Sequence, residues 1–554
     1  MRSRRLVISA AAIVAAGMGL LPGVAQAADP SAPGAHRVAP GPDLKKAGTP
    51  KAKTFTSGAD KTVGKAGSAT AQAEGAVTGN PDLKIGLTAV NTTARGVHLE
   101  TVITSVDSKL SIVINWGDGV LERISAGGSV TLKNEHVYEN PGAYEVSVGV
   151  DDPANKVYRE NAVTFTTLGS EFTPHVPTRL LDTRDGFRAP NAKVAPRGTA
   201  RVQIADYGMI PADITAVALN VTVTNTTSGG HITAYPAGTV RPDASNVNFE
   251  AGETVPNLVI VPVGEDGSVD LFNGGWEAVD LVADITGYFS QKGASGYTPM
   301  DPVRFVDTRE GLGTAKGQVA GQTSFGTRIS GLRGVPQGVT AVALNVTATN
   351  PKEAGHLVVY PSGGRIPLAS SVNFTAGQTV ANSVIVPVGP DGTISIRNSA
   401  WAATDVVVDV VGHYSPEGKG ALMPFSPLRW LDTREPDGAF GRMDARSYLA
   451  TQLSGWEPGD TGISGFVLNT TVTNTAGAGF LSVAPDPNSP EQYETGTQVQ
   501  PARPSSSALN WTKGKTVANL VQAASGPHGI VDFWNQGWEE TDLVVDLSGY
   551  YDTQ

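Results

Sequence analysis

The sequence contains no cysteine. This excludes disulfide bonds, cysteine-ligated metals, thiol catalysis and lipid attachment through a cysteine, so burial and backbone pairing must stabilise the fold. Charged residues are also scarce, at 17% of the chain against roughly 25% in typical globular domains. The formal net charge is −11, and so acidic a chain lacks the basic footprint that nucleic-acid binding requires. We therefore expect no nucleic-acid partner.

Sequence signatures of enzymes are missing as well. No G-x-S-x-G, H-E-x-x-H or phosphate-binding loop occurs, and the Gly-rich stretch at 311–317 lacks a strand–helix context. His231 and His356 match in two repeats, but Phe480 stands in the third, which argues against a histidine-based metal or acid–base role. Acidic residues at 150–152 leave calcium open there, although no D-x-D-x-D-G loop supports it. We expect no catalytic residue, metal site or cofactor.

A sustained apolar run occurs at the N-terminus. Residues 1–27 combine a basic start, an apolar stretch over 6–21 and an Ala-Gln-Ala ending at 25–27, which is the pattern of a secretory signal peptide. The stretch is shorter than the roughly 20 residues of a comfortable membrane span, so no membrane anchor is expected. The prediction is a secreted protein, extracellular or held non-covalently at the cell wall. The paired arginines at 4–5 leave the export route open.

Residues 28–80 show no hydrophobic period and are rich in Ala, Gly, Pro, Thr and Lys. Such a segment cannot bury enough apolar surface to offset the entropy of ordering, so the sequence predicts a disordered linker. The segment is mildly basic, and a weak grip on an anionic cell-wall polymer is the alternative to a bare tether.

From 81 to 169 short alternating runs predict a small β-sandwich. A set of turn and aromatic residues stands out here: Trp116, Gly117, Asp118, Gly119, His136, Tyr138, Pro141, Gly142 and Tyr144. The set resembles the signature of the PKD (polycystic kidney disease-type) domain. The resemblance implies an immunoglobulin-like sandwich that serves as a spacer or contacts proteins or glycans, with a tight turn at 117–119, Trp116 and Tyr144 packed inside, and no catalysis.

The rest of the chain repeats itself. Asp182, Asp307 and Asp432 recur at constant spacing within three similar units, at 173–290, 297–415 and 423–552, and the third carries an inserted loop at about 486–507. Each unit reads as about seven or eight strands, several apolar on both faces, and is long enough for its own core. The prediction is three homologous β-sandwiches in a row; a six-bladed ring with two blades per repeat is the alternative. These units resemble the R-L-L-D-T-R…G-Y-F repeats of secreted actinobacterial proteins.

The repeated charges predict a folding device. Asp284, Asp409 and Asp546 lie mid-strand among branched apolar residues, where a carboxylate needs a partner. A bidentate arginine is the natural one, so we expect first and last strands of each repeat to be neighbours, locked by the pairs Arg184–Asp284, Arg309–Asp409 and Arg434–Asp546. Asp280 and Asp284 would lie about 13 Å apart along one strand, which is too wide for a glycosidase pair.

Aromatic residues are the candidates for ligand contact. Trp276, Trp401 and Trp538 each follow a short polar turn sequence, and turn positions are usually at the surface. Tyr235 and Tyr360 are further candidates. The alternative is that the tryptophans fold back and cap the sandwich.

Taken together, these patterns indicate an all-β, secreted, non-catalytic protein with several domains. We expect multivalent attachment to a cell-wall or environmental polysaccharide. Other surface proteins are the second class of partner that this design would fit. A purely structural surface or matrix spacer is the first alternative, in which the tryptophans would be buried. An extracellular hydrolase of unrecognised type is the second, and would need a deep polar cleft in one repeat.

Overall fold

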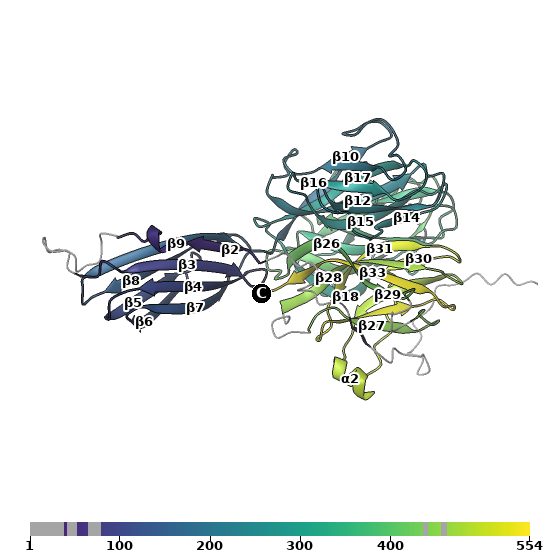
Figure 1. Ribbon diagram of the computed structural model, residues 1–554. Helices are drawn as coiled ribbons and strands as arrows, with labels where there is room; N and C mark the ends of the chain where they lie inside the picture. Colours follow the sequence, from purple (N-terminus) through teal and green to yellow (C-terminus); the bar gives the residue numbers. More distant parts are fainter. Residues whose placement is uncertain (1–37, 41–51, 65–78, 436–440, 456–461) are drawn as a thin grey trace, which may run out of the picture.

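The computed structural model describes residues 38–40, 52–64, 79–435, 441–455 and 462–554. It shows an all-β protein in which an N-terminal sandwich is joined to a larger body of three repeats (Figure 1). The predicted signal peptide and most of the predicted linker lie outside the described residues. No helix in the described ranges has the length and apolar character needed to cross a membrane.

The N-terminal sandwich consists of two four-stranded sheets, with strand orders β2-β3-β4-β7 and β6-β5-β8-β9. Every second side chain of β3 is buried, as expected for a strand with one face on a core. The strands are β2 (Thr54–Ser57), β3 (Lys84–Asn91), β4 (Gly96–Thr104), β5 (Lys109–Asn115), β6 (Leu121–Gly127), β7 (Val130–Val137), β8 (Ala143–Asp152) and β9 (Val157–Thr166).

Strand β2 lies inside the segment predicted to be a disordered linker, so that prediction was wrong for residues 54–61. The strand pairs antiparallel with β3, and the short helix η1 (Ala59–Lys61) follows it. Phe55 packs against the core and meets the Phe165 ring edge-on, with centroids 6.1 Å apart. Alternation over only four residues is too brief to distinguish such a strand from the polar sequence around it.

Each repeat is a sandwich of an inner and an outer four-stranded sheet. In repeat 1 the inner order is β10-β17-β12-β15 and the outer order is β11-β16-β13-β14. The strands are β10 (Glu171–Asp182), β11 (Thr199–Gln203), β12 (Ile214–Thr224), β13 (Gly230–Pro236), β14 (Val247–Phe249), β15 (Val255–Pro262), β16 (Ser268–Asn273) and β17 (Asp280–Ser290). The first and last strands, β10 and β17, pair with each other as expected.

Repeats 2 and 3 have the same topology. Repeat 2 contains β18 (Gly296–Asp307), β19 (Ser324–Arg328), β20 (Ala341–Thr349), β21 (Gly355–Pro361), β22 (Val372–Phe374), β23 (Val380–Pro387), β24 (Thr393–Asn398) and β25 (Asp405–Ser415). Repeat 3 contains β26 (Ala421–Asp432), β27 (Tyr448–Gln452), β28 (Ile463–Thr473), β29 (Gly479–Pro485), β30 (Leu509–Trp511), β31 (Val517–Ala524), β32 (Ile530–Asn535) and β33 (Asp542–Asp552).

The three repeats close on one another instead of standing in a row or forming six blades. Each sandwich keeps its own core, and a further core is shared by all three inner sheets, with β15, β23 and β31 in mutual contact. Its members include Phe172, Phe289, Leu258, Tyr297, Tyr414, Ile385, Leu422, Tyr551 and Leu520. Inner strands such as β17 are apolar on both faces and need a cover on each. One face packs on the outer sheet of the same repeat, and the other face packs on the inner sheets of the other two repeats.

The connection from the N-terminal sandwich to repeat 1 and the two connections between repeats meet at one end of this body. Ser170 donates its backbone N–H to Leu422 at 3.0 Å, Phe172 to Ser295 at 2.9 Å, and Tyr297 to Gly420 at 2.8 Å. We call the three connections, residues 167–172, 290–297 and 415–422, the hub. Each connection is thereby hydrogen-bonded to the other two.

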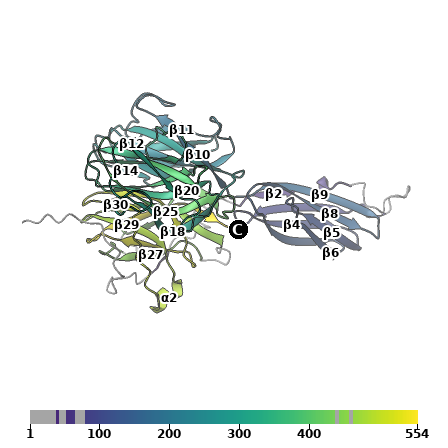
Figure 2. The same cartoon turned by 180° about the vertical axis from the view of Figure 1, so that it is seen from behind.

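The N-terminal sandwich is docked on the hub through a buried ion pair. Arg95 and Glu171 lie 3.0 Å apart, with side chains only 2% and 7% exposed. The backbone N–H of Arg95 donates to Gln554 at 2.8 Å, and that of Ala94 to the Asp552 carboxylate at 3.0 Å. The sandwich therefore extends from the end of the body where the C-terminus lies (Figures 1 and 2).

Repeat 3 differs from the others on its outer face. Its inserted loop carries the helix α2 (Pro490–Thr495), which begins at a capping box formed by Ser489 and Gln492. Tyr493 of this helix packs on Tyr448 and Trp534 of the outer sheet. Strand β1 (Val38–Pro40) pairs parallel with β27 and makes that sheet five-stranded. Helix α2 and strand β1 are thus additions to the outer sheet of the third repeat.

Candidate binding site

The R-L-L-D-T-R motif locks strands and repeats together through its first arginine, and the prediction had named its second. Arg179 lies directly opposite Asp284 in the β10–β17 register, and its Nε donates to that carboxylate at 2.6 Å. Its Nη1 donates to Asp182, and its Nη2 reaches the Leu368 carbonyl of repeat 2 at 3.5 Å. Arg184 instead turns back and donates from Nε to Asp182 at 2.9 Å. The prediction Arg184–Asp284 was therefore wrong.

The other two repeats show the same correction. Arg304 donates to Asp409 at 2.5 Å and Arg429 to Asp546 at 2.6 Å, whereas Arg309 and Arg434 bind Asp307 and Asp432. Arg304 also reaches the Ser505 carbonyl of repeat 3, and Arg429 the Asp243 carbonyl of repeat 1. The motif thus joins repeat 1 to 2, 2 to 3 and 3 to 1.

The carboxylates of this lock are engaged in structure. Burial raises the pKa of Asp284 even with Arg179 beside it, and hydrogen bonds from Arg184 lower the pKa of Asp182. Asp280, the other acid on β17, accepts hydrogen bonds from Thr183 at 2.8 Å and from Asn225 at 2.7 Å. These acids hold strands and turns in place.

The three repeated tryptophans stand out into solvent. Trp276, Trp401 and Trp538 are 74%, 84% and 76% exposed, and each lies on the turn between the last outer strand and the last inner strand. They do not fold back onto the sandwich. Exposed indoles at one position in three repeats are good platforms for sugar rings or partner chains.

A buried asparagine shapes each tryptophan turn. Asn273 accepts a hydrogen bond from the backbone N–H of Gly275 at 2.9 Å, and its amide donates to the carbonyls of Glu277 at 2.9 Å and Val194 at 3.2 Å. Trp276 lies between the two clamped backbone groups and is held outward. Asn398 and Asn535 make the corresponding bonds in the other repeats. These asparagines were not predicted as site residues, although one precedes each turn.

A second loop lies beside each turn. Residues 197, 322 and 446 occupy equivalent left-handed positions on it, with φ of 57°, 59° and 57°. The guanidinium of Arg197 lies 4.3 Å from the centroid of the Trp276 ring, and that of Arg446 lies 5.0 Å from Trp538. Repeat 2 has Gln322 at this position. These arginines also went unnoticed in the sequence.

All three tryptophan turns lie at the end of the body away from the hub. β17 begins just after Trp276 and ends at Ser290 in the hub, and its 11 residues span about 36 Å. β25 and β33 are equally long and run the same way. The N-terminal sandwich extends from the opposite end of the body (Figure 1), so the three turns lie at the end far from it.

The tyrosine candidates do not belong to these turns. Tyr235 and Tyr360 are 8% and 6% exposed, since both lie within strands of the outer sheets. The hydroxyl of Tyr360 donates to Ser324 at 3.3 Å. The prediction that these two tyrosines contact a ligand is therefore wrong.

The residues singled out in the N-terminal sandwich form an aromatic cluster around its turn. Trp116 is buried and stacks on His136, Tyr138 donates its hydroxyl to the Trp116 carbonyl at 2.8 Å, and half-buried Tyr144 stacks on Tyr138. His136 lies 2.7 Å from Asp118. Gly117 and Gly119 have positive φ, and Pro141 and Gly142 precede β8. The cluster serves packing.

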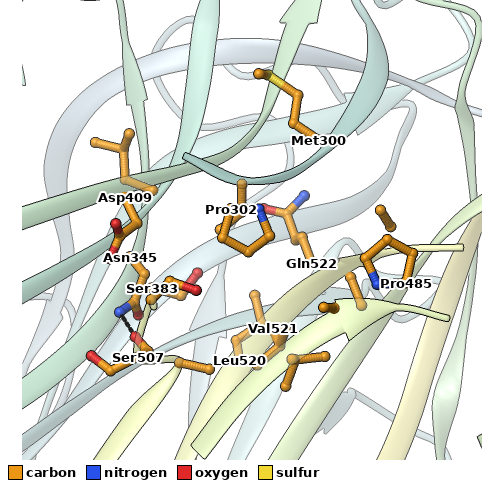
Figure 3. Close-up of a pocket in the computed structure, with 18 residues that line it drawn as sticks. Met300, Pro302, Asn345, Ser383, Asp409, Pro485, Ser507, Leu520, Val521 and Gln522 are labelled. Carbon is orange, nitrogen blue, oxygen red and sulfur yellow. Dashed lines mark hydrogen bonds between the residues drawn. The ribbon is translucent and has the colours of Figure 1, made fainter. Parts of the chain in front are cut away.

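A cavity of about 30 Å³ lies between repeats 2 and 3 (Figure 3). Met300 and Pro302 of repeat 2 and Pro485 and Gln522 of repeat 3 line it. This volume holds a water molecule or two and no sugar. In the described part of the chain, no cluster of three or more histidine, aspartate or glutamate side chains could hold a metal ion.

Comparisons with known proteins give no family. No family model matches the chain, and no curated protein matches it. Among solved structures, a SusE-like protein matches at 10% identity and TM-score 0.11, over 37% of this chain and 96% of its own. A carbohydrate-binding module of a β-sandwich superfamily matches at 10% and 0.13, over 36% and 92%. The triple jelly roll of an archaeal virus turret matches at 10% and 0.15, over 70% and 91%. TM-scores this low carry no inference about function.

Proposed function

We propose that the protein is a secreted, non-catalytic binding protein whose three repeats present a trivalent face to a polysaccharide of a cell wall or of the surroundings. The signal-peptide pattern at 1–27 supports export. The N-terminal sandwich, which resembles a PKD domain in sequence, would act as a spacer at the end of the body opposite the tryptophan turns. The repeats resemble those of secreted actinobacterial proteins, which fits an extracellular setting.

The observation that carries the proposal is the exposure of Trp276, Trp401 and Trp538 on turns fixed by buried asparagines. Keeping a large apolar side chain in water has no benefit for folding, and three equivalent cases in one chain point to contact with something outside it. Three weak sites on one rigid face gain affinity through effective concentration. Polysaccharides repeat their units and can engage all three.

The experiment is a pull-down of the mature protein on insoluble chitin, cellulose and peptidoglycan. The Trp276→Ala/Trp401→Ala/Trp538→Ala variant should lose binding that the unmodified protein shows. The matched control replaces Met209, Val240 and Leu368, which are equally exposed apolar residues outside the tryptophan turns, by alanine. This control should bind normally.

Binding that survives in the tryptophan variant would overturn the assignment of the site. An absence of binding to every polymer, with all variants folded, would favour the purely structural spacer. The buried Arg95–Glu171 ion pair, which docks the N-terminal sandwich on the repeats, is the feature that favours such a spacer.

A further inference from the structure

The three tryptophan turns are not chemically alike, and the difference lies in the residue over the ring. In repeat 1 the Arg197 guanidinium lies 4.3 Å from the Trp276 ring centroid. Among the described residues, no hydrogen bond or ion pair engages that guanidinium, and the side chain is exposed. Stacking on the indole fixes the plane of the group while its N–H donors stay at the edge.

Repeat 3 holds its arginine in a similar place. Arg446 lies 5.0 Å from the Trp538 ring centroid, and its Nη1 donates to the Gln536 carbonyl at 3.0 Å. That bond ties the guanidinium to the tryptophan turn itself. A second arginine, Arg503, donates to the Arg446 carbonyl at 2.8 Å and brings further positive charge.

Repeat 2 presents a bare ring. Gln322 takes the arginine's place in the same left-handed backbone conformation, and its amide donates to the Ser399 carbonyl at 2.7 Å. Arg397 donates to the Gln322 side-chain oxygen at 2.7 Å and is thereby engaged. Trp401 is accordingly the most exposed of the three tryptophans, at 84%.

Positive charge gathers around the turn of repeat 1 in particular. Arg241 lies 3.9 Å from the Phe272 ring centroid, one strand residue before Asn273. After burial, the charges of Arg197 and Arg241 are the main causes that lower the pKa of His231, which lies against Gly274 of the turn; Asp243 opposes them. The exposed Glu277 follows Trp276 in the same turn, so the two arginines lie beside one neighbouring acid there, in a chain whose net charge is −11.

Building on the proposed function, we infer that the sites of repeats 1 and 3 take anionic sugar units, while the site of repeat 2 takes a neutral one. The sugar ring would lie on the exposed indole, and its carboxylate or phosphate would receive two N–H donors from the stacked guanidinium. Arginine forks match the geometry of both anions. The target is therefore an acidic polysaccharide, recognised at two of three points by charge.

The test compares a polymer that carries carboxylates, its neutral ester and a phosphate polymer without sugar rings. Polygalacturonate, its fully methyl-esterified counterpart and poly(glycerol phosphate) are titrated by calorimetry at low salt and at roughly 0.3 M salt. The Arg197→Gln/Arg446→Gln variant gives repeats 1 and 3 the residue of repeat 2, and Gln322→Arg does the reverse. Arg197→Gln alone serves where the double variant melts lower, because Arg197 makes no structural hydrogen bond.

The double variant should bind an anionic polymer about tenfold more weakly at low salt, and the methyl ester as before. Gln322→Arg should increase the affinity for an anionic polymer by about threefold. Binding of poly(glycerol phosphate) as strong as that of polygalacturonate would overturn the stacking part of the inference, because that polymer has no sugar ring to lie on the indole. Equal binding of charged and esterified polymers, lost in the tryptophan variant but unchanged by arginine replacement, would overturn this inference and leave the proposed function standing. Binding that ignores the tryptophans would overturn both.

Discussion

The inner and outer sheets of the repeats treat equivalent positions differently. In the inner sheets, one arginine position does the same thing three times: it binds the mid-strand aspartate of its own sandwich and a carbonyl of the next repeat. The residues are Arg179, Arg304 and Arg429. Each of these residues has to satisfy two repeats at once, so a change in one copy disturbs a neighbour as well as its own sandwich.

In the outer sheets, one position does three different things. Asp270 pairs with Arg201 at 2.8 Å near the surface, the equivalent residue of repeat 2 is Ser395, and Asp532 of repeat 3 is buried beside Asp486. This outer-sheet position is not tied to another repeat by the contacts described, so each copy is free to differ. Packing around the common core restricts which residue can stand at an inner-sheet position. An outer-sheet position is less restricted, so its residue differs among the repeats.

The largest expected effect comes from breaking an inner lock. Arg179→Ala leaves the Asp284 carboxylate buried without its partner and should cost about 3–5 kcal/mol in free energy of unfolding. Arg184→Ala, in the same motif, removes a half-exposed pair with Asp182 and should cost about 0–1 kcal/mol. Urea unfolding followed by fluorescence measures both. Equal losses would mean that the inner lock is no stronger than a surface pair.

The next effect tests whether the outer sheets also hold a constrained residue. Asn273→Ala removes an amide that bonds three carbonyls and a backbone N–H, and should cost about 1–3 kcal/mol. Asn248→Ala is the matched control, since that amide donates only to Ser245 at 3.4 Å. Thermal unfolding should separate the two variants. If they unfold alike, the turn does not depend on its asparagine.

A pH-dependent effect of similar size is expected at Asp532. Burial, with Asp486 beside it, raises the pKa of Asp532 far above that of an unfolded aspartate, about 3.9. As pH rises past that value the unfolded chain releases a proton that the folded chain keeps, so this group's contribution to stability falls. Asp532→Asn should therefore be the more stable protein at pH 8, by on the order of 1–3 kcal/mol, with the gain shrinking toward pH 4.

The control for that experiment is Asp270→Asn, at the equivalent position of repeat 1. It should show no such gain at pH 8, because Asp270 has an arginine partner. Urea midpoints of both variants across the pH range give the comparison. A gain at pH 8 in both variants would show that burial in repeat 3 is not the cause.

The smallest effect is expected from Arg201→Ala in the outer sheet of repeat 1. The Arg201 side chain is 53% exposed, and solvent screens its pairs with Asp270 and Asp266. Its unfolding midpoint should shift less than that of Arg184→Ala. A shift approaching that of Arg179→Ala would erase the distinction between inner and outer sheets.

Much of the fold follows from the sequence pattern, but the partner of each buried aspartate does not. Repetition and alternating apolar residues predicted three sandwiches, and the need of each mid-strand aspartate for an arginine partner predicted neighbouring first and last strands. Arg179 and Arg184 lie only five residues apart, and the choice between them depends on register shifts in β10 after Pro174 and after Arg179. A bulge moves side chains from one face to the other, and the sequence does not mark where it occurs.

The site was open to prediction in part. A tryptophan on a turn can point outward or fold back, and the clamp by Asn273 that decides this becomes visible only with the backbone. Tyr235 lies in a strand, where neighbouring strands decide exposure. The inner strands are apolar on both faces, which is consistent with three repeats packed around a common core. Separate domains in a row, each with further elements packed on that sheet, would show the same sequence pattern. Only contacts between distant residues distinguish these arrangements.

The hub has a consequence for copy number. Each connection there is hydrogen-bonded to the other two, and each inner sheet already contacts both of its counterparts, so a fourth tandem copy would find no vacant place in the assembly. Gene duplication of this module therefore yields a closed body only at three copies. A single copy on its own would leave exposed the apolar inner-sheet surface that the other two repeats cover here.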